Sequence, residues 1–496
     1  MALSIVNIAR NSLKFTSVNF LAALMSFFVT IYVATILVPE EYGEFGFLSL
    51  WLMYAGLIGP GIASAASREM PVLIGRDREK EALRVQNISV TTELLFTIIP
   101  FVVILGASFF YSEPVLKFGL LIIAISYIAS RLVGFWSHMN FIRERFNIVA
   151  KVRLITAIIP PVVILASIYW LKVYALLLAP VIGSIVCGIY YWKKGSINYH
   201  FIFDRAEVVR LVKVGIVLQG LNLIYWGFRL ADRTIIASML PFEQLGLYAF
   251  AMGFLMYASM LFEDFTRVLQ PILWREAGKA DSIIEGFQDT RRITVYLALV
   301  VGILIPLAQL GFFLIVRVIT RNYIDSIPIF YVLSYNLYFI MIGIIPALVL
   351  NSSLINKQKL TLYCFSVGLA LNIIFDILVI KLGYGVIGVT LVTVCTQGLV
   401  SFILYYFVKG YVFRDTKQFL IFLLRIIVPF MIAVPFYFLH TYLDVIAPNF
   451  WVFIGVSLAA QLVTWTLLIG IFYRNYLSAT DIKILAKEIK MLVTRR

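Results

Sequence analysis

The chain alternates between long apolar runs and short polar connections. The first run lies between Lys14 and Glu40 and holds no charged residue. At about 1.5 Å of rise per helical residue it is long enough to cross a bilayer, and it is too long for the apolar core of a signal peptide. Similar apolar runs recur along the whole chain and predict fourteen membrane-spanning helices. They lie at residues 15–38, 45–66, 88–110, 115–137, 154–170, 173–192, 214–239, 245–266, 293–316, 327–350, 360–380, 384–408, 418–440 and 450–473.

Composition supports an all-α polytopic membrane protein. Of the 496 residues, 62% are hydrophobic and 14% are charged, whereas soluble domains are about half apolar and one quarter charged. The three cysteines, Cys187, Cys364 and Cys395, all fall in apolar runs. This placement argues against a disulfide framework and against a cysteine metal site.

The distribution of charge predicts the orientation in the membrane. Alternate connections, together with the two termini, hold 32 of the 41 Lys and Arg residues. Cytoplasmic loops carry such an excess, so we expect a multi-pass protein of the cytoplasmic (inner) membrane with both termini cytoplasmic. The formal net charge of +15 then reflects orientation and contact with anionic membrane lipids, and not a nucleic-acid partner.

An internal repeat divides the chain. Residues 34–47 read as the end of one helix, a short turn and the start of the next, and residues 237–250 repeat this pattern 203 positions later. Duplicated helical domains are typical of transporters with two halves around a central site, and a six-helix unit makes the repeats parallel. The predicted parts are an N-terminal six-helix half (1–192), a cytoplasmic amphipathic linker (193–213), a C-terminal six-helix half (214–408), two extra helices (409–473) and a basic amphipathic tail (474–496).

Ionisable residues inside the predicted spans are the best indicators of function, because each costs roughly 2.5–3.5 kcal/mol to insert. The seventh span is the richest and places Arg229, Asp232 and Arg233 beside Tyr225 and Trp226. Arginine suits bidentate contact with phosphate, so one interpretation is an anion-binding patch for substrate. The other is an ion pair that caps the helix near the outer interface.

Three further residues in the spans are candidates for ion pairs or ion coupling. Asp376 lies at an estimated depth close to that of Arg229, so it either pairs with Arg229 or Arg233 or takes a proton or Na⁺ in a coupling cycle. Glu93 and Arg131 share a shallower depth and are expected to be partners, with a packing salt bridge favoured over a transport role.

Sequence support for an enzyme is weak. The three histidines, His138, His200 and His440, show no metal-ligand spacing, and no Gly-rich phosphate loop of the Walker type occurs. We therefore expect neither catalytic residues nor a metal or other cofactor.

Several motifs resemble those of one family. They are LVPEEYG at 37–43, the Asp232–Arg233 pair, LGLY at 245–248 and GYGVIG at 383–388. In this order and spacing the chain resembles the polysaccharide-repeat flippases of O-antigen and exopolysaccharide pathways. These belong to the superfamily that includes the multidrug and toxin extrusion antiporters and the peptidoglycan lipid II flippases.

The resemblance implies export of an undecaprenyl-pyrophosphate-linked oligosaccharide, with its headgroup in a cleft between the halves and its lipid tail in the bilayer. We also expect alternating access, with H⁺ or Na⁺ as a candidate coupling ion and other polysaccharide-pathway proteins as candidate partners. Two alternatives remain: a small-molecule cation antiporter on the same scaffold, and a scaffold protein of the pathway that transports nothing.

Overall fold

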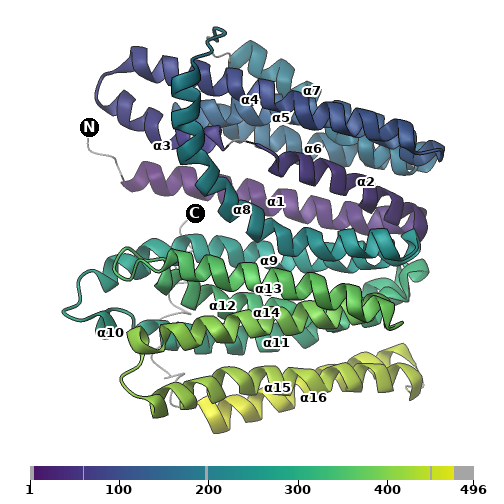
Figure 1. Cartoon of the computed structure of the whole chain (residues 1–496). Helices are drawn as coiled ribbons and strands as arrows, with labels where there is room; N and C mark the ends of the chain where they lie inside the picture. The colour runs from purple at the N-terminus through teal and green to yellow at the C-terminus, as the bar shows by residue number, and fades with distance from the viewer. Residues whose placement is uncertain (1–4, 60, 196–198, 447–448, 474–496) are drawn as a thin grey trace. The chain divides into compact units, whose positions relative to one another are not determined.

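The computed structural model of the chain describes residues 5–473, apart from 60, 196–198 and 447–448 (Figure 1). The described residues form helices joined by short turns, and no strand occurs among them. The α-helices are α1 Ile5–Ile36, α2 Pro39–Leu57, α3 Ile62–Gly75, α4 Glu79–Ala107, α5 Pro114–Ile142, α6 Phe146–Leu171, α7 Val173–Lys194, α8 Arg205–Met239, α9 Phe242–Ala277, α10 Ile283–Gly286, α11 Asp289–Val318, α12 Ser326–Leu350, α13 Gln358–Lys381, α14 Gly385–Val412, α15 Thr416–Ile446 and α16 Phe450–Leu468. Short helical turns follow at η1 Ser108–Phe110, η2 Arg321–Tyr323 and η3 Ile469–Tyr473.

The predicted all-α membrane architecture is confirmed. Among the described residues, ten helices are long and apolar enough to cross a membrane, and Leu21–Ile36 adds a shorter apolar stretch. The count of fourteen spans is not confirmed. The predicted basic tail, residues 474–496, lies outside the described residues.

The prediction of one continuous span at 45–66 is wrong. Helix α2 ends at Leu57 and α3 begins at Ile62, and between them Gly61 adopts a φ of 68°. A side chain at Gly61 would also meet the carbonyl oxygen of Gly215 in α8 at 2.3 Å. Only glycine combines this left-handed backbone conformation with such close contact, so the apolar run is broken here although its hydropathy continues.

Helix α8 begins within the predicted linker, at an N-cap that the sequence supplies. Asp204 accepts hydrogen bonds from the backbone N–H groups of Ala206 at 3.0 Å and Glu207 at 3.3 Å, and from the Arg84 guanidinium at 2.7 Å. These hydrogen bonds lower the pKa of the Asp204 carboxyl because they stabilise its charged form. The bond from the Glu207 N–H has the largest effect. Residues 205–213 are thus continuous with the helix that carries Asp232.

The described chain falls into two compact units. The first comprises Met1–Ala258, Ile315–Phe330 and Phe365–Thr396. In it α6 packs against α1 and α7, while α5 packs against α2, α4 and α7, and these neighbours lie side by side in Figure 1. A buried cluster that includes Leu48, Leu120, Tyr127 and Leu177 joins α2, α5 and α7.

The second unit comprises Ser259–Leu314, Tyr331–Cys364 and Gln397–Arg496. Buried tyrosine hydroxyls connect its helices: Tyr405 in α14 donates to the Ile342 carbonyl of α12 at 2.6 Å, and Tyr338 donates to the Ile426 carbonyl of α15. The Phe313 and Phe453 rings stack with centroids 4.3 Å apart. Helices α15 and α16 pack against each other (Figure 1).

The internal repeat reappears as a symmetric contact within the first unit. The turn between α1 and α2 and the turn between α8 and α9 begin and end 203 positions apart, as the sequence repeat requires. A Cβ on Gly43 would lie 1.8 Å from the carbonyl oxygen of Phe242, and one on Gly246 would lie 1.7 Å from that of Pro39. Helices α2 and α9 therefore pack with backbone against backbone. The contact is symmetric, because Gly43 and Phe242 on one side of it correspond to Gly246 and Pro39 on the other.

We predict that Gly43→Ala and Gly246→Ala each lower the Tm of the purified protein. In a helix, alanine is normally about 1 kcal/mol better than glycine, but here the added methyl would force the two backbones apart at a cost of several kcal/mol. The controls are Gly56→Ala in α2 and Gly253→Ala in α9, where nothing lies within 4 Å of the new methyl. Equal Tm values for the crossing variants and their controls would contradict the close approach.

Candidate functional site

Two aspartates meet in the interior of the first unit. Asp232 on α8 and Asp376 on α13 both have no solvent exposure. The Tyr248 hydroxyl of α9 donates to Asp232 Oδ2 at 2.7 Å, and the Thr393 hydroxyl of α14 donates to the same oxygen at 2.8 Å. Four helices therefore converge on one carboxylate.

The carboxyl of Asp376 faces that of Asp232, and Asn372, one turn earlier on α13, faces Asp232 as well. Both Asp376 oxygens, both polar atoms of the Asn372 side chain and Asp232 Oδ1 are buried without a hydrogen-bond partner among the described residues. Buried polar atoms are nearly always hydrogen-bonded, and two adjacent buried carboxylates cannot both stay charged without a counter-ion. This acidic cluster, Asp232, Asp376, Asn372, Tyr248 and Thr393, therefore has the chemistry of a proton or cation site made of oxygen ligands.

For two of the alternatives considered above, the described residues show no ion pair. Asp376 makes no ion pair with Arg229 or Arg233, because its carboxyl is directed at Asp232. The alternative of an ion pair that caps the end of α8 gains no support at Asp232, whose carboxylate accepts hydrogen bonds from the Tyr248 and Thr393 hydroxyls.

The two arginines lie on α8 around Asp232. The Arg229 guanidinium stacks over the Trp226 ring, 5.3 Å from its centroid. Arg233 is partly buried; its Nε has no hydrogen-bond partner among the described residues, and its Nη2 contacts the thioether sulfur of Met256 at 3.9 Å. The side chain of Tyr225, which was also predicted to belong to the site, lies outside the part of the chain that the structure describes.

The predicted partners Glu93 and Arg131 do form an ion pair between α4 and α5. The Glu93 carboxylate also accepts a hydrogen bond from the Ala63 N–H in the first turn of α3, at 3.3 Å. A carboxylate is favourable there because the first N–H groups of a helix have no partner within it. The pair therefore stabilises the helix start that the break at Gly61 creates.

Sequence reasoning missed three members of the acidic cluster. Asn372 and Thr393 lie in predicted spans and look like ordinary polar residues of membrane helices, and Tyr248 was noted only as part of a motif. One signal was available, since Asn372 and Asp376 are four residues apart and share a helix face.

Comparison with known proteins places the chain in a family. Residues 8–276, more than half of the chain, match the family described as polysaccharide biosynthesis protein. The chain belongs to this family. No curated protein sequence matches it significantly.

Solved transporter structures share its fold. A lipid II flippase MurJ in an inward closed conformation aligns with a TM-score of 0.64 at 15% identity, covering 93% of this chain and 99% of the flippase. An inward-facing multidrug resistance MATE family transporter of the MOP superfamily aligns with a TM-score of 0.61 at 13% identity, covering 82% and 96%. The chain therefore has a MurJ- and MATE-like fold.

We predict that Arg131→Leu destabilises the protein more than Glu93→Leu and Arg131→Leu combined. The single change leaves the nearly buried Glu93 carboxylate without its cation. Breaking a fully buried pair costs about 3–5 kcal/mol, and the cost here is smaller because the Arg131 side chain is partly exposed. Thermal unfolding of the purified single and double variants provides the comparison. If the double variant were the least stable of the series, the account of this ion pair would be wrong.

Proposed function

We propose that the protein is a flippase that moves an undecaprenyl-pyrophosphate-linked polysaccharide repeat unit from the inner to the outer leaflet of the cytoplasmic membrane by alternating access. The family and the fold support a lipid-linked flippase or a related transporter. The finer assignment, to O-antigen, exopolysaccharide or lipopolysaccharide synthesis, rests on the sequence motifs.

The observation that carries the proposal is the environment of Arg233. Its guanidinium is partly buried, forms no ion pair with a described residue, and has a thioether as a contact where a carboxylate would be expected. A buried cation whose N–H groups form no ion pair is costly, even with the Asp232 carboxyl on the same helix. An anionic cargo group would compensate it, and arginine presents a fork of donors that matches the oxygens of a pyrophosphate.

The acidic cluster supplies a coupling element next to this arginine on α8. When both aspartates are ionised their repulsion is relieved by a proton or Na⁺, and the hydroxyl and amide oxygens of Thr393, Tyr248 and Asn372 are ligands that suit a hard cation. Loading and release of this ion would change the charge beside Arg233 and thereby its affinity for an anion. Outward movement of each negative charge is also favoured by about 2.3 kcal/mol per 100 mV of membrane potential.

The same acidic cluster favours a second candidate, a small-molecule cation antiporter, because buried carboxylates are what a cationic substrate needs. The two candidates differ over Arg233, since a guanidinium that forms no ion pair with a described residue repels a cation. A scaffold protein would need neither group.

We expect Arg233→Ala and Arg229→Ala to reduce flipping at least about tenfold, the effect of losing one charge-assisted hydrogen bond of about 1.5–3 kcal/mol. The measurement is outward exposure of a fluorescent undecaprenyl-pyrophosphate oligosaccharide in liposomes. Arg205→Ala, an exposed arginine at the start of the same helix, is the control and should transport normally. Export of an organic cation by a native chain that moves no lipid-linked glycan would support the antiporter instead.

We expect Asp376→Asn and Asp232→Asn to abolish the ion dependence of transport, because each removes one of the two facing carboxylates. Binding of radioactive Na⁺ and proton release on Na⁺ addition, both in detergent, distinguish the two ions. Asp325→Asn, an exposed aspartate, should leave binding unchanged. Native ion binding and native ion dependence in Asp376→Asn would eliminate the coupling role.

A further inference from the structure

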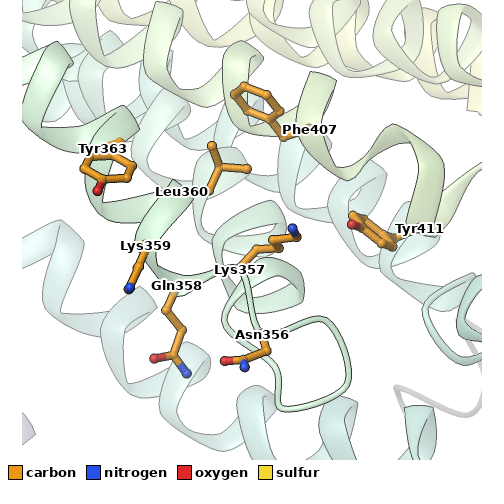
Figure 2. A pocket seen from close by; sticks show the side chains of 8 residues that line it. All are labelled: Asn356, Lys357, Gln358, Lys359, Leu360, Tyr363, Phe407 and Tyr411. Carbon is orange, nitrogen blue, oxygen red and sulfur yellow. The ribbon is translucent and has the colours of Figure 1, made fainter.

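A hollow of about 710 Å³ lies in the second unit, where α13 begins (Figure 2). Its lining comes from the turn before α13, the first turns of α13 and the last turns of α14. Figure 2 shows Lys357 between Tyr363 on one side and Tyr411 on the other, with Asn356 below and Phe407 above. None of the functional residues considered so far contributes to it.

The hollow is positively charged. Lys357 and Lys359 are exposed, neither forms an ion pair with a described residue, and the lining contains no acidic side chain. The start of α13 adds the partial positive charge of a helix N-terminus. A cavity of this kind attracts an anion of the phosphate type, for which lysine is a suitable point charge.

Helix α13, whose first turns line the hollow, carries an exposed apolar face. Beyond Tyr363, the exposed side chains of Val367, Ile374 and Leu378 follow along α13. Their spacing of four, seven and four residues keeps them on one face of the helix. A ligand held by its charged end at the lysines would therefore have an apolar surface for a hydrocarbon chain.

We propose that this hollow binds the headgroup of an anionic phospholipid of the surrounding bilayer, with the phosphate at Lys357 and Lys359 and an acyl chain along α13. The turn before α13 lies on the side predicted to be cytoplasmic, where anionic lipids give the membrane its negative surface potential. The site is separate from the proposed transport site and does not depend on the transport proposal.

A phospholipid fits the lining better than the proposed cargo does. A sugar headgroup needs many hydrogen-bonding partners, but apart from the lysines the polar side chains of the lining are only the Asn356 and Gln358 amides and the hydroxyls of Tyr363 and Tyr411. The lining also lacks arginine, the residue suited to bidentate contact with a pyrophosphate.

The test is a titration of the detergent-solubilised full chain with phosphatidylglycerol, followed by native mass spectrometry. We expect Lys357→Gln with Lys359→Gln to raise the Kd about 30-fold, because each lysine near a membrane surface contributes roughly a factor of five to anionic lipid binding. The control is Lys193→Gln with Lys194→Gln, which removes the same charge from two exposed lysines at the end of α7 and should leave the Kd unchanged.

Other ligands decide the identity of the occupant. We expect phosphatidylcholine to bind more weakly, and inorganic phosphate and undecaprenyl phosphate not to displace phosphatidylglycerol at equal concentration. Displacement by inorganic phosphate would overturn the proposal in favour of a free-anion site, and preferential displacement by undecaprenyl phosphate in favour of a cargo site. An unchanged Kd in the Lys357 and Lys359 variant, or an equal increase in the control, would remove the site. Because no transport is measured, these results are independent of the flippase assay.

Discussion

The crossing of α2 and α9 at Gly43 and Gly246 is the constraint on which the geometry of the candidate site depends. A side chain at either glycine would overlap the carbonyl oxygen of Phe242 or Pro39, so the two helix starts touch through their backbones. Aromatic rings surround the contact, with Tyr42 against Phe250 and Tyr323, and the Tyr323 hydroxyl donates to the Leu37 carbonyl at 3.1 Å. Since only a short turn separates α8 from α9, fixing the start of α9 also fixes the end of α8 and brings Tyr248 to Asp232.

Polar groups in the helices fall into two kinds, and the difference connects the structure with function. Glu93 and Arg131 satisfy each other and the start of α3, so they need no further partner to stabilise the fold. Asp376, Asn372 and Arg233 retain buried polar atoms without a partner among the described residues. Such atoms are costly away from water. Groups that stay unsatisfied in the protein are those that a ligand or an ion would pair with, and here Arg233 lies beside Asp232 of the acidic cluster on α8.

The sequence predicted these features to different degrees, for physical reasons. The repeat was predicted to the residue because the helix that follows each turn carries a glycine, Gly43 or Gly246, where a side chain would overlap the other repeat. The Glu93–Arg131 pair followed from rise per residue, which gives the depth of a side chain along its helix. Depth does not give the direction of a helix face, and for this reason it left Asp376 with two alternatives, an arginine partner or a coupling ion, and did not predict that Asp376 faces Asp232. Hydropathy likewise could not show the break at Gly61, because the residues on both sides stay apolar while the backbone changes its direction.

The most direct test of the central claim, that ion loading beside Arg233 drives export of an anionic lipid-linked glycan, uses the native chain alone. Proteoliposomes loaded with a fluorescent undecaprenyl-pyrophosphate oligosaccharide would be given a Na⁺ or proton gradient, and movement of the glycan between leaflets would be followed as the gradient is imposed and then collapsed with an ionophore. The account predicts that movement accelerates with a gradient of one of the two ions and slows when that gradient is collapsed. Movement at the same rate with and without either gradient, or no movement of any lipid-linked glycan, would contradict it.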